Sequence, residues 1–247
     1  MRPWTTLDRV DTPEGPLELR QRGEKDFLIT IDSRVLMTSS AHRSEDALAV
    51  AACEPLLGLS KPRVLIGGLG MGFTLRAALD HLPADARVDV VDLNERVVAW
   101  CRGPLAPLTH AAVLDPRVKV SVGDVAHTIA RAPAGHYDAI VIDLYEGPHH
   151  ALNGPRDPLY GTAALALTHH ALAPRGIFAV WSEEPDRPFE QRMAAAGFSL
   201  ARQRSGQGGR LHAVYVGEKQ RLPIRPPRDL ASPPPRPSGR RPPKRRG

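Results

Sequence analysis

A glycine-rich turn after a short apolar run is the feature of this sequence that most restricts its fold. Residues 64–66 (VLI) are apolar, residues 67–72 read GGLGMG, and a helical pattern follows over residues 73–81. A strand-to-helix turn of this kind presents backbone N–H groups and a helix N-terminus to a ligand, and glycine has no Cβ to block close approach. The turn therefore supplies the first candidate ligand-binding residues, which are Gly67, Gly68, Gly70 and Gly72.

A carboxylate stands where a nucleotide site of this type needs one. A second apolar run, residues 88–91, ends in Asp92, twenty positions after Gly72. In α/β nucleotide-binding domains a carboxylate at this place accepts hydrogen bonds from the ribose hydroxyls. The alternative is that Asp92 caps the helix that begins near Asn94. Because the glycine turn precedes it, we favour the nucleotide-binding interpretation.

Strand and helix patterns alternate along the chain after residue 61. The apolar runs are residues 64–66, 88–91, 118–122, 139–142 and 177–181, and the helical patterns are residues 73–81, 94–101, 125–131 and 161–172. This alternation predicts a doubly wound, mainly parallel α/β sheet of the Rossmann-like type, with helices on both faces. Ligands of such sheets bind beyond the C-terminal ends of the strands. Those ends are the glycine turn, Asp92, residues 123–124 and residues 143–148.

Two flanking segments differ from this α/β domain, for which we expect the bounds 44–220. Short alternating patterns within residues 1–43 predict a small antiparallel β unit, followed by a helix over about residues 45–57 with Ser44 as its N-cap. Residues 221–247 hold nine prolines and nine Lys/Arg against one Asp, whereas residues 1–220 hold 24 basic and 26 acidic residues. We expect this basic tail to be disordered. It either solubilises the protein or binds nucleic acid or an anionic surface weakly.

The remaining composition excludes several classes of protein. No apolar run approaches the roughly 20 residues that a transmembrane helix requires, and the first ten residues lack the apolar core of a signal peptide. We therefore expect a cytoplasmic protein with no membrane insertion. Cys53 and Cys101 lack the spacing of a zinc site, and His149 and His150 have no third ligand in sequence, so no metal site is predicted.

The strand-end motifs resemble those of one known family. Residues 61–68 (KPRVLIGG), residues 115–118 (DPRV) with Gly123-Asp124, and residues 137–143 (YDAIVID) resemble the successive core motifs of the spermidine synthase family, a branch of the class I S-adenosylmethionine-binding fold. Residues 159–178 are similar to the next helix and strand of that family in spacing. The resemblance covers about residues 20–200 and includes the small N-terminal β unit.

This resemblance implies a transferase and a set of donor-binding residues. The co-substrate would be S-adenosylmethionine or its decarboxylated form, the acceptor an amine or another small nucleophile, and the assembly a homodimer. Gly68 and Gly70 would face the amino-acid or aminopropyl end of the donor, Asp92 the ribose and Asp124 the adenine amino group. The alternative for Asp124 is that it caps its own helix. The remaining predicted donor-binding residues are Gly67, Gly72, Leu93, Gly123 and Asp143.

Residues 143–148 (DLYEGP) stand where the family has its catalytic loop. The family carries two aspartates three positions apart before a Gly-Pro. Here Asp143 is retained and Glu146 takes the second place. Two carboxylates can desolvate an attacking amine, take up its proton and neutralise a cationic acceptor. The resemblance therefore implies Asp143, Tyr145 and Glu146 as catalytic residues, and the alternative is a loop whose acids are merely solvated.

The sequence departs from the family at the donor end. The family has an acid, which binds the aminopropyl ammonium, where this chain has Gly70. The family's Gln and its Tyr-His-Glu run have Leu36 and residues 44–46 as their nearest counterparts. Unless Glu45, Asp46 or another acid compensates, we expect poor discrimination between S-adenosylmethionine and its decarboxylated form.

Three functions remain open. The family-typical reaction is aminopropyl transfer from decarboxylated S-adenosylmethionine to an amine or polyamine. The second is methyl transfer from S-adenosylmethionine to a small molecule or peptide. The third is a non-catalytic scaffold that binds a nucleoside weakly, and the carboxylates Asp92, Asp124 and Asp143 at three strand ends count against it. From position alone, we expect Trp181 or Glu183 to line the acceptor pocket.

Overall fold

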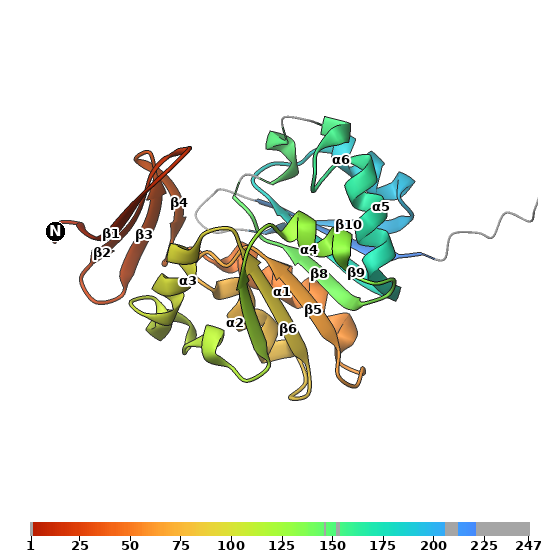
Figure 1. Ribbon diagram of the computed structural model, residues 1–247, viewed down its shortest axis with the longest axis horizontal. Helices are drawn as coiled ribbons and strands as arrows, with labels where there is room; N and C mark the ends of the chain where they lie inside the picture. Colours follow the sequence, from red (N-terminus) through yellow and green to blue (C-terminus); the bar gives the residue numbers. More distant parts are fainter. Residues whose placement is uncertain (1, 146, 152–153, 206–211, 221–247) are drawn as a thin grey trace, which may run out of the picture.

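Two β-sheets organise the computed structural model, which describes residues 2–145, 147–151, 154–205 and 212–220. The first sheet is antiparallel, and its strands follow one another in sequence order. They are β1 (Thr5–Thr12), β2 (Gly15–Arg22), β3 (Asp26–Ile31) and β4 (Arg34–Thr38). This sheet stands at one end of the molecule (Figure 1). The predicted N-terminal β unit is therefore confirmed, whereas the predicted basic tail, residues 221–247, lies outside the described residues.

The second sheet has seven strands in the order β10-β11-β9-β8-β5-β6-β7. Its five parallel strands are β5 (Arg63–Gly67), β6 (Arg87–Asp92), β7 (Val118–Val122), β8 (Tyr137–Ile142) and β9 (Leu172–Ser182). The antiparallel strands β10 (Phe198–Ser205) and β11 (His212–Lys219) complete it beyond β9. The predicted doubly wound α/β sheet is confirmed, and the β10–β11 pair is an addition that the sequence patterns did not predict.

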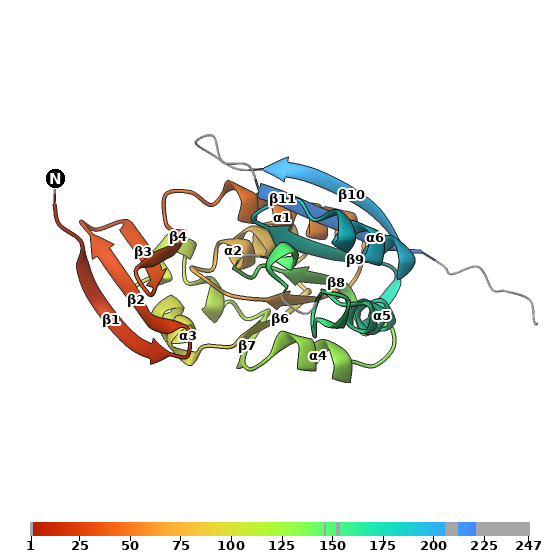
Figure 2. The same cartoon turned by 90° about the horizontal axis from the view of Figure 1, so that it is seen from above.

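Helices cover both faces of the seven-stranded sheet (Figure 2). The α-helices are α1 (Arg43–Cys53), α2 (Phe73–His81), α3 (Glu95–Arg102), α4 (Val125–Arg131), α5 (Thr162–Ala171) and α6 (Arg187–Ala195). Short 3-10 turns are η1 (Glu54–Leu56), η2 (Ala106–Thr109), η3 (Ala112–Leu114), η4 (Pro148–His150) and η5 (Gly154–Arg156). Alternate residues of each central strand enter opposite cores: Val64 and Ile66 pack with α1 to α3, whereas Leu65 packs with α4 to α6. Burial on both sides explains the uninterrupted apolar runs of the parallel strands.

The first helix begins earlier than the sequence patterns predicted. Helix α1 starts at Arg43 with His42 at the N-cap position, and its α-helical part ends at Cys53, followed by η1. The prediction of Ser44 as the N-cap is wrong. Ser44 lies within the helix, is buried, and donates a hydrogen bond from Oγ to the carboxylate of Glu45. The side chain of Ser44 thus supports a buried acid.

The N-terminal sheet is joined to the α/β domain by a polar contact and by a shared core. The indole Nε1 of Trp100 on α3 donates to Asp8 Oδ2 at 2.8 Å, and Arg96 pairs with Asp8 Oδ1 at 3.3 Å. The Trp100 hydrogen bond lowers the pKa of Asp8. Apolar side chains of β2 and β3, such as Leu19 and Ile29, belong to the same buried cluster as α1 to α3. The sheet is therefore packed against the domain and not tethered beside it.

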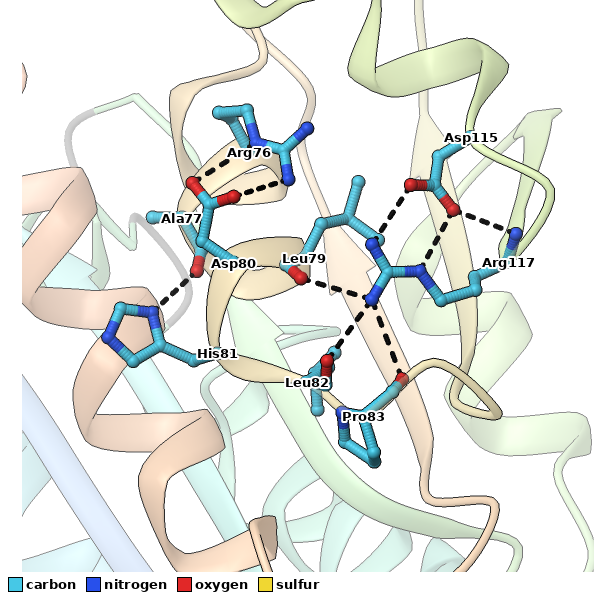
Figure 3. Close-up of polar contacts among 9 residues, drawn as sticks. All are labelled: Arg76, Ala77, Leu79, Asp80, His81, Leu82, Pro83, Asp115 and Arg117. Carbon is cyan, nitrogen blue, oxygen red and sulfur yellow. Dashed lines mark hydrogen bonds and ion pairs between the residues drawn. The ribbon is translucent and has the colours of Figure 1, made fainter.

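The side chain of the partly buried Arg117 binds the C-terminal end of α2 (Figure 3). Arg117 is the third residue of the DPRV segment, residues 115–118. It makes a bidentate ion pair with Asp115, in which both N–O distances are 2.9 Å. Its Nη1 also donates to the backbone carbonyls of Leu79 and Leu82 at 3.0 and 3.1 Å. Carbonyls at a helix C-terminus lack intrahelical donors, so this guanidinium satisfies them. The family-like segment at residues 115–118 thus has a structural task.

No helix within the described part of the chain is long and apolar enough to cross a membrane.

Replacing Arg117 with methionine is expected to destabilise the fold by about 1.5–3 kcal/mol, the scale for losing hydrogen bonds to a charged group. Methionine keeps the apolar stem but leaves Asp115 and the α2 carbonyls without their donor. Urea denaturation measures the change. Asp80→Asn is the matched control, because Asp80 pairs with Arg76 at the surface, where ion pairs contribute about 0–1 kcal/mol. Equal stability of Arg117→Met and the wild type would contradict this account.

The Arg117–Asp115 ion pair makes the stability of the fold depend on pH. Arg117 lowers the pKa of Asp115 from 3.8 to about 2. The pKa of Asp115 is lower in the folded protein than in the unfolded chain. The ion pair therefore stabilises the fold fully above pH 3.8, and this stabilisation is lost as the pH falls from 3.8 towards about 2. The stability difference between wild type and Arg117→Met should therefore shrink over this acid range.

Candidate active site

The glycine turn after β5 is built from left-handed backbone conformations. Gly68, Gly70 and Gly72 have φ values of 90°, 51° and 86°, which favour glycine. A Cβ on Gly68 would lie 2.1 Å from the backbone oxygen of Asp143, so only glycine lets the turn approach the end of β8 this closely. Gly67 ends β5, and its carbonyl accepts from the Asp143 N–H at 2.8 Å. The turn and the end of β8 therefore form one unit.

Asp92 lies against this turn at the end of β6. Its Oδ2 accepts from the Leu69 N–H and its Oδ1 from the Asn94 N–H, both at 2.8 Å. Burial raises the pKa of Asp92, while these backbone hydrogen bonds act in the opposite direction. Asn94, and not Asp92, occupies the N-cap position of α3, since Asn94 Oδ1 accepts from the Arg96 N–H. A carboxylate has about four acceptor positions, so Asp92 retains capacity for a ligand hydroxyl.

The other residues predicted for the nucleoside follow β6, in the case of Leu93, and β7, in the case of Gly123 and Asp124. Leu93 is 78% exposed, and the position of a Cβ on Gly123 has no atom within 4 Å. Asp124 caps α4 by accepting from the Ala126 N–H at 2.7 Å, as the alternative interpretation expected. Its Oδ2 lies 3.9 Å from His127 at the surface. Asp124 is not among the residues that line the cavity described below.

Asp143 is the most perturbed carboxyl group of the site. Its Oδ2 accepts a short hydrogen bond from the Thr74 hydroxyl, 2.5 Å away at the start of α2. Burial and, after it, the charge of Glu45 raise the pKa of Asp143 from 3.8 to about 7, against the smaller lowering by Thr74. A carboxyl group with such a pKa holds or releases a proton near neutral pH, which is what proton transfer requires.

Glu45 is a site residue that the candidate list from sequence did not contain. It lies in the first turn of α1, is only 8% exposed, and faces the same cavity as Asp143. Its helix face is otherwise apolar: Leu48, Ala49 and Ala52, three, four and seven positions further on, are fully buried. An acid in phase with such a face is the signal by which the sequence indicates a buried carboxylate. Asp46, by contrast, pairs with His42 at 2.9 Å.

A cavity of about 230 Å³ brings these groups together. Gly68, Gly70 and the carboxylates Asp92, Asp143 and Glu45 contribute to its lining from the α/β domain. Its other lining residues are Leu17, Ile29, Leu36, Met37, Val97, Leu144, Tyr145 and Trp181. Four of these come from the N-terminal sheet, which therefore closes the cavity over the strand ends. Of the two residues expected at the acceptor pocket, Trp181 lines this cavity, while Glu183 is not in its lining and lies 4.0 Å from His149; the acceptor role stays a prediction.

Met37 of β4 covers the glycine turn directly. Its sulfur accepts from the Met71 N–H at 3.3 Å, and a Cβ on Gly70 would lie 3.0 Å from the same sulfur. In this protein the thioether of Met37 therefore covers Gly70, the position at which the family carries an acid.

The loop after β8 packs against Ser182 at the end of β9 through Gly147 and His149. Gly147 has φ 74°, and a Cβ there would lie 2.7 Å from the Cα of Ser182. His149 Nδ1 lies 3.2 Å from the Ser182 hydroxyl. Tyr145 is partly exposed, and the Arg34 guanidinium lies 5.0 Å from its ring centroid. Glu146, the second predicted catalytic acid, lies outside the described residues.

Other candidate groups of the described chain show no comparable arrangement. Both cysteines are free and buried, and burial raises the pKa of each thiol to about 12, so they are not reactive nucleophiles. Within the described ranges, no three His, Cys, Asp or Glu side chains are grouped so as to hold a metal ion.

Comparisons with known proteins agree with this geometry. The family model for the spermine/spermidine synthase domain matches residues 53–193. Polyamine aminopropyltransferase 2 of Pseudomonas aeruginosa is 34% identical over 165 residues, which cover 63% of this chain and 46% of that protein. Putrescine N-methyltransferase 1 of Nicotiana tabacum is 34% identical over 130 residues, covering 52% of this chain and 33% of that protein. The chain thus spans less than half the length of these curated relatives.

Solved structures show the same fold. The spermidine synthase of Thermotoga maritima superposes with a TM-score of 0.71 at 18% identity, covering 89% of this chain and 74% of the other. A spermidine synthase in complex with the transition-state analogue AdoDATO gives a TM-score of 0.70 at 17% identity, with the same coverage. At this identity the likeness establishes the architecture of both sheets. The family model match over more than half of the chain establishes more: this protein belongs to the spermine/spermidine synthase family.

Proposed function

We propose that this protein transfers an alkyl group from a sulfonium nucleoside to an amine, with aminopropyl transfer from decarboxylated S-adenosylmethionine as its reaction. The single observation that carries the proposal is that Asp143 and Glu45 line one small cavity beside the glycine turn, where the charge of Glu45 contributes to the raised pKa of Asp143. A carboxyl group with a perturbed pKa in a cavity is characteristic of functional sites. A scaffold has no need to meet the free-energy cost of placing two carboxyl groups in one buried cavity.

The chemistry assigns each carboxylate a task. The amine nitrogen attacks the carbon bonded to the sulfonium, the carbon–sulfur bond breaks, and its electron pair neutralises the sulfur to a thioether. The nitrogen must lose one proton, and Asp143, with its raised pKa, accepts it. Thr74 holds the Asp143 carboxylate in place by its hydrogen bond. Glu45 binds the ammonium of the decarboxylated donor and takes over the task of the family acid that Gly70 replaces.

The nucleoside lies, in this proposal, along the ends of β5, β6 and β7. Asp92 accepts from the ribose hydroxyls while its backbone hydrogen bonds keep the turn in place. Gly68 and Gly70 leave room for the donor's chain, with Gly67, Gly72 and Leu93 bordering it. Asp124 and Gly123 border the adenine, and Asp124 uses its second oxygen there because the first caps α4. Tyr145 and Glu146 remain proposed catalytic-loop residues.

Methyl transfer from S-adenosylmethionine is the second candidate. Gly70 favours it, because the turn itself has no carboxylate to repel that of the methionine moiety. The similarity to a putrescine N-methyltransferase supports it as well. The position of Glu45 supports aminopropyl transfer over methyl transfer, since a carboxylate in this cavity attracts an ammonium and repels a donor carboxylate.

Product analysis by mass spectrometry with an alkylamine acceptor tests the reaction. We expect 5′-methylthioadenosine from the decarboxylated donor in excess over S-adenosylhomocysteine from S-adenosylmethionine. Glu45→Gln removes a charged hydrogen bond of about 1.5–3 kcal/mol and should weaken binding of the decarboxylated donor by about tenfold or more. Binding of S-adenosylmethionine should not weaken, because the same change removes the repulsion of its carboxylate. Asp143→Asn should lower turnover at least about 10²-fold with nearly unchanged donor binding.

The matched pair Gly70→Asp and Gly70→Asn isolates the charge at the turn. Both side chains tolerate the left-handed conformation of Gly70 and both meet Met37, so they differ in charge alone. The aspartate variant should favour the decarboxylated donor over the asparagine variant by at least about 1.4 kcal/mol, a factor of ten. Preferential S-adenosylhomocysteine formation by the wild type would reject aminopropyl transfer in favour of methyl transfer.

The pKa of Asp143 supplies an independent test of its assigned role. Carboxyl-carbon NMR should show Asp143 titrating at about 7 in the free wild-type protein. Glu45→Gln removes a neighbouring negative charge and should lower this pKa. Thr74→Val removes a hydrogen bond to the carboxylate and should raise it. Opposite shifts in the two variants are required, and a pKa that both leave unchanged would show that Asp143 is not in this environment.

A further inference from the structure

Glu45 reaches the cavity from the first turn of α1, and the neighbouring residue Ser44 hydrogen-bonds to its carboxylate. The Ser44 hydroxyl donates to Glu45 Oε2 at 2.5 Å. Both residues are buried, with Ser44 5% and Glu45 8% exposed. Hydrogen bonds of about 2.5–2.7 Å from a hydroxyl to a carboxylate are charge-assisted and stronger than those between neutral groups. This bond uses one carboxylate oxygen and leaves Oε1 to accept from a ligand in the cavity.

Two carboxyl groups in one buried cavity repel each other when both are ionised, and two changes at Glu45 would relieve this repulsion. The side chain of Glu45 could rotate away from Asp143, or it could take up a proton itself. The Ser44 hydrogen bond opposes both changes, because it restricts rotation of the side chain and favours the carboxylate over the neutral acid. The charge of Glu45 therefore stays near Asp143, where, after burial, it raises the pKa of Asp143.

Asp143 has a corresponding hydroxyl partner on the next helix. Thr74, the second residue of α2, donates to Asp143, just as Ser44, the second residue of α1, donates to Glu45. The two helices pack against each other, so their first turns bring both hydroxyls to the acids of one cavity. The N-terminus of a helix also favours a nearby negative charge. Both carboxyl groups of the cavity are thus oriented by a hydroxyl from the start of a helix.

We propose that Ser44 is a positioning residue, which directs the Glu45 carboxylate towards the donor ammonium and so determines the selectivity of the cavity for the decarboxylated donor. This inference rests on the proposed function, in which Glu45 binds that ammonium, and adds a second residue to the selectivity. Ser44 is not among the described lining residues of the cavity, so it acts through Glu45 and takes no part in making or breaking bonds.

The titration of Asp143, followed by carboxyl-carbon NMR, tests the role of Ser44 without any ligand. Ser44→Ala should lower the pKa of Asp143, as Glu45→Gln does, because Glu45 without its partner rotates away or takes up the proton. Ser44→Thr keeps the hydroxyl and should restore the wild-type value. In the Glu45→Gln background, Ser44→Ala should cause no further shift. An unchanged titration of Asp143 in a folded Ser44→Ala protein would overturn the inference.

Ser205→Ala is the matched control for the placement of α1. The Ser205 hydroxyl donates to the backbone carbonyl of Arg43, the first residue of the helix, at 3.2 Å. Its removal takes a hydroxyl from the same helix start without changing the partner of Glu45. The control should therefore leave the titration of Asp143 at its wild-type position, and thermal melting checks that all variants fold. An equal shift in Ser205→Ala and Ser44→Ala would show that movement of the helix, and not the Ser44 hydrogen bond, is responsible, and would overturn the inference.

Two unreactive thioethers test the selectivity by calorimetric titration. S-adenosylhomocysteine and its decarboxylated form both carry the ammonium and differ only in the carboxylate. The wild type should bind the decarboxylated form more tightly, and Ser44→Ala should reduce this preference about three- to tenfold, the scale of one hydrogen bond. Ser44→Thr should restore the preference. 5′-Methylthioadenosine, which lacks the ammonium, should bind all variants equally.

The outcomes separate the positioning role from the proposed function. If a folded Ser44→Ala protein keeps the wild-type preference between the two thioethers, the inference is overturned and the proposed function stands. If the wild type binds none of the three nucleosides, the proposed function fails and the inference fails with it.

Discussion

The close approach between the turn after β5 and the end of β8 is the constraint on which the rest of the site depends. Gly68 has no side chain, and the backbone oxygen of Asp143 occupies the space that a Cβ would take, at 2.1 Å. The Asp143 N–H also donates a hydrogen bond to the carbonyl of Gly67, the residue before Gly68. This proximity lets the Asp143 carboxylate reach the Thr74 hydroxyl at the start of α2. A larger residue at position 68 would separate the strand end that carries the acid from the turn beside which we propose that the donor binds.

The close approach of the turn and β8 places the Asp143 carboxyl group in the same small cavity as Glu45. Glu45 is brought to the cavity by α1, an element that precedes the parallel strands in sequence, and its charge adds to burial in raising the pKa of Asp143. Burial of like charges is unfavourable in the free protein. We infer that a cationic ligand relieves this repulsion and that the cavity therefore selects positive charge. The N-terminal sheet strengthens this effect by covering the cavity with apolar side chains, because charges interact more strongly where water is excluded.

The sequence patterns predicted the α/β sheet because its central strands are buried on both faces and therefore read as uninterrupted apolar runs. They also predicted which strand ends carry carboxylates, since the order of strands and turns determines this. They did not predict β10 and β11: Phe198–Ser205 carries mostly polar, exposed residues at the sheet edge, so its pattern resembles a loop. The N-cap at Ser44 was wrong because a serine before an acid has the same sequence signature whether it caps a helix or supports a buried glutamate. The place of Met37 over the glycine turn was beyond prediction, because packing of one sheet over another brings together residues that are distant in sequence.

Binding of a nucleoside at the strand ends is the central claim, and calorimetric titration with 5′-methylthioadenosine tests it most directly. This thioether lacks the amino-acid end, so its binding depends on the ribose and adenine contacts alone. The account predicts saturable binding at one site per chain, weakened about tenfold or more in Asp92→Asn, which loses the charge that accepts the ribose hydroxyls. An absence of binding, or equal affinity in wild type and Asp92→Asn, would contradict it.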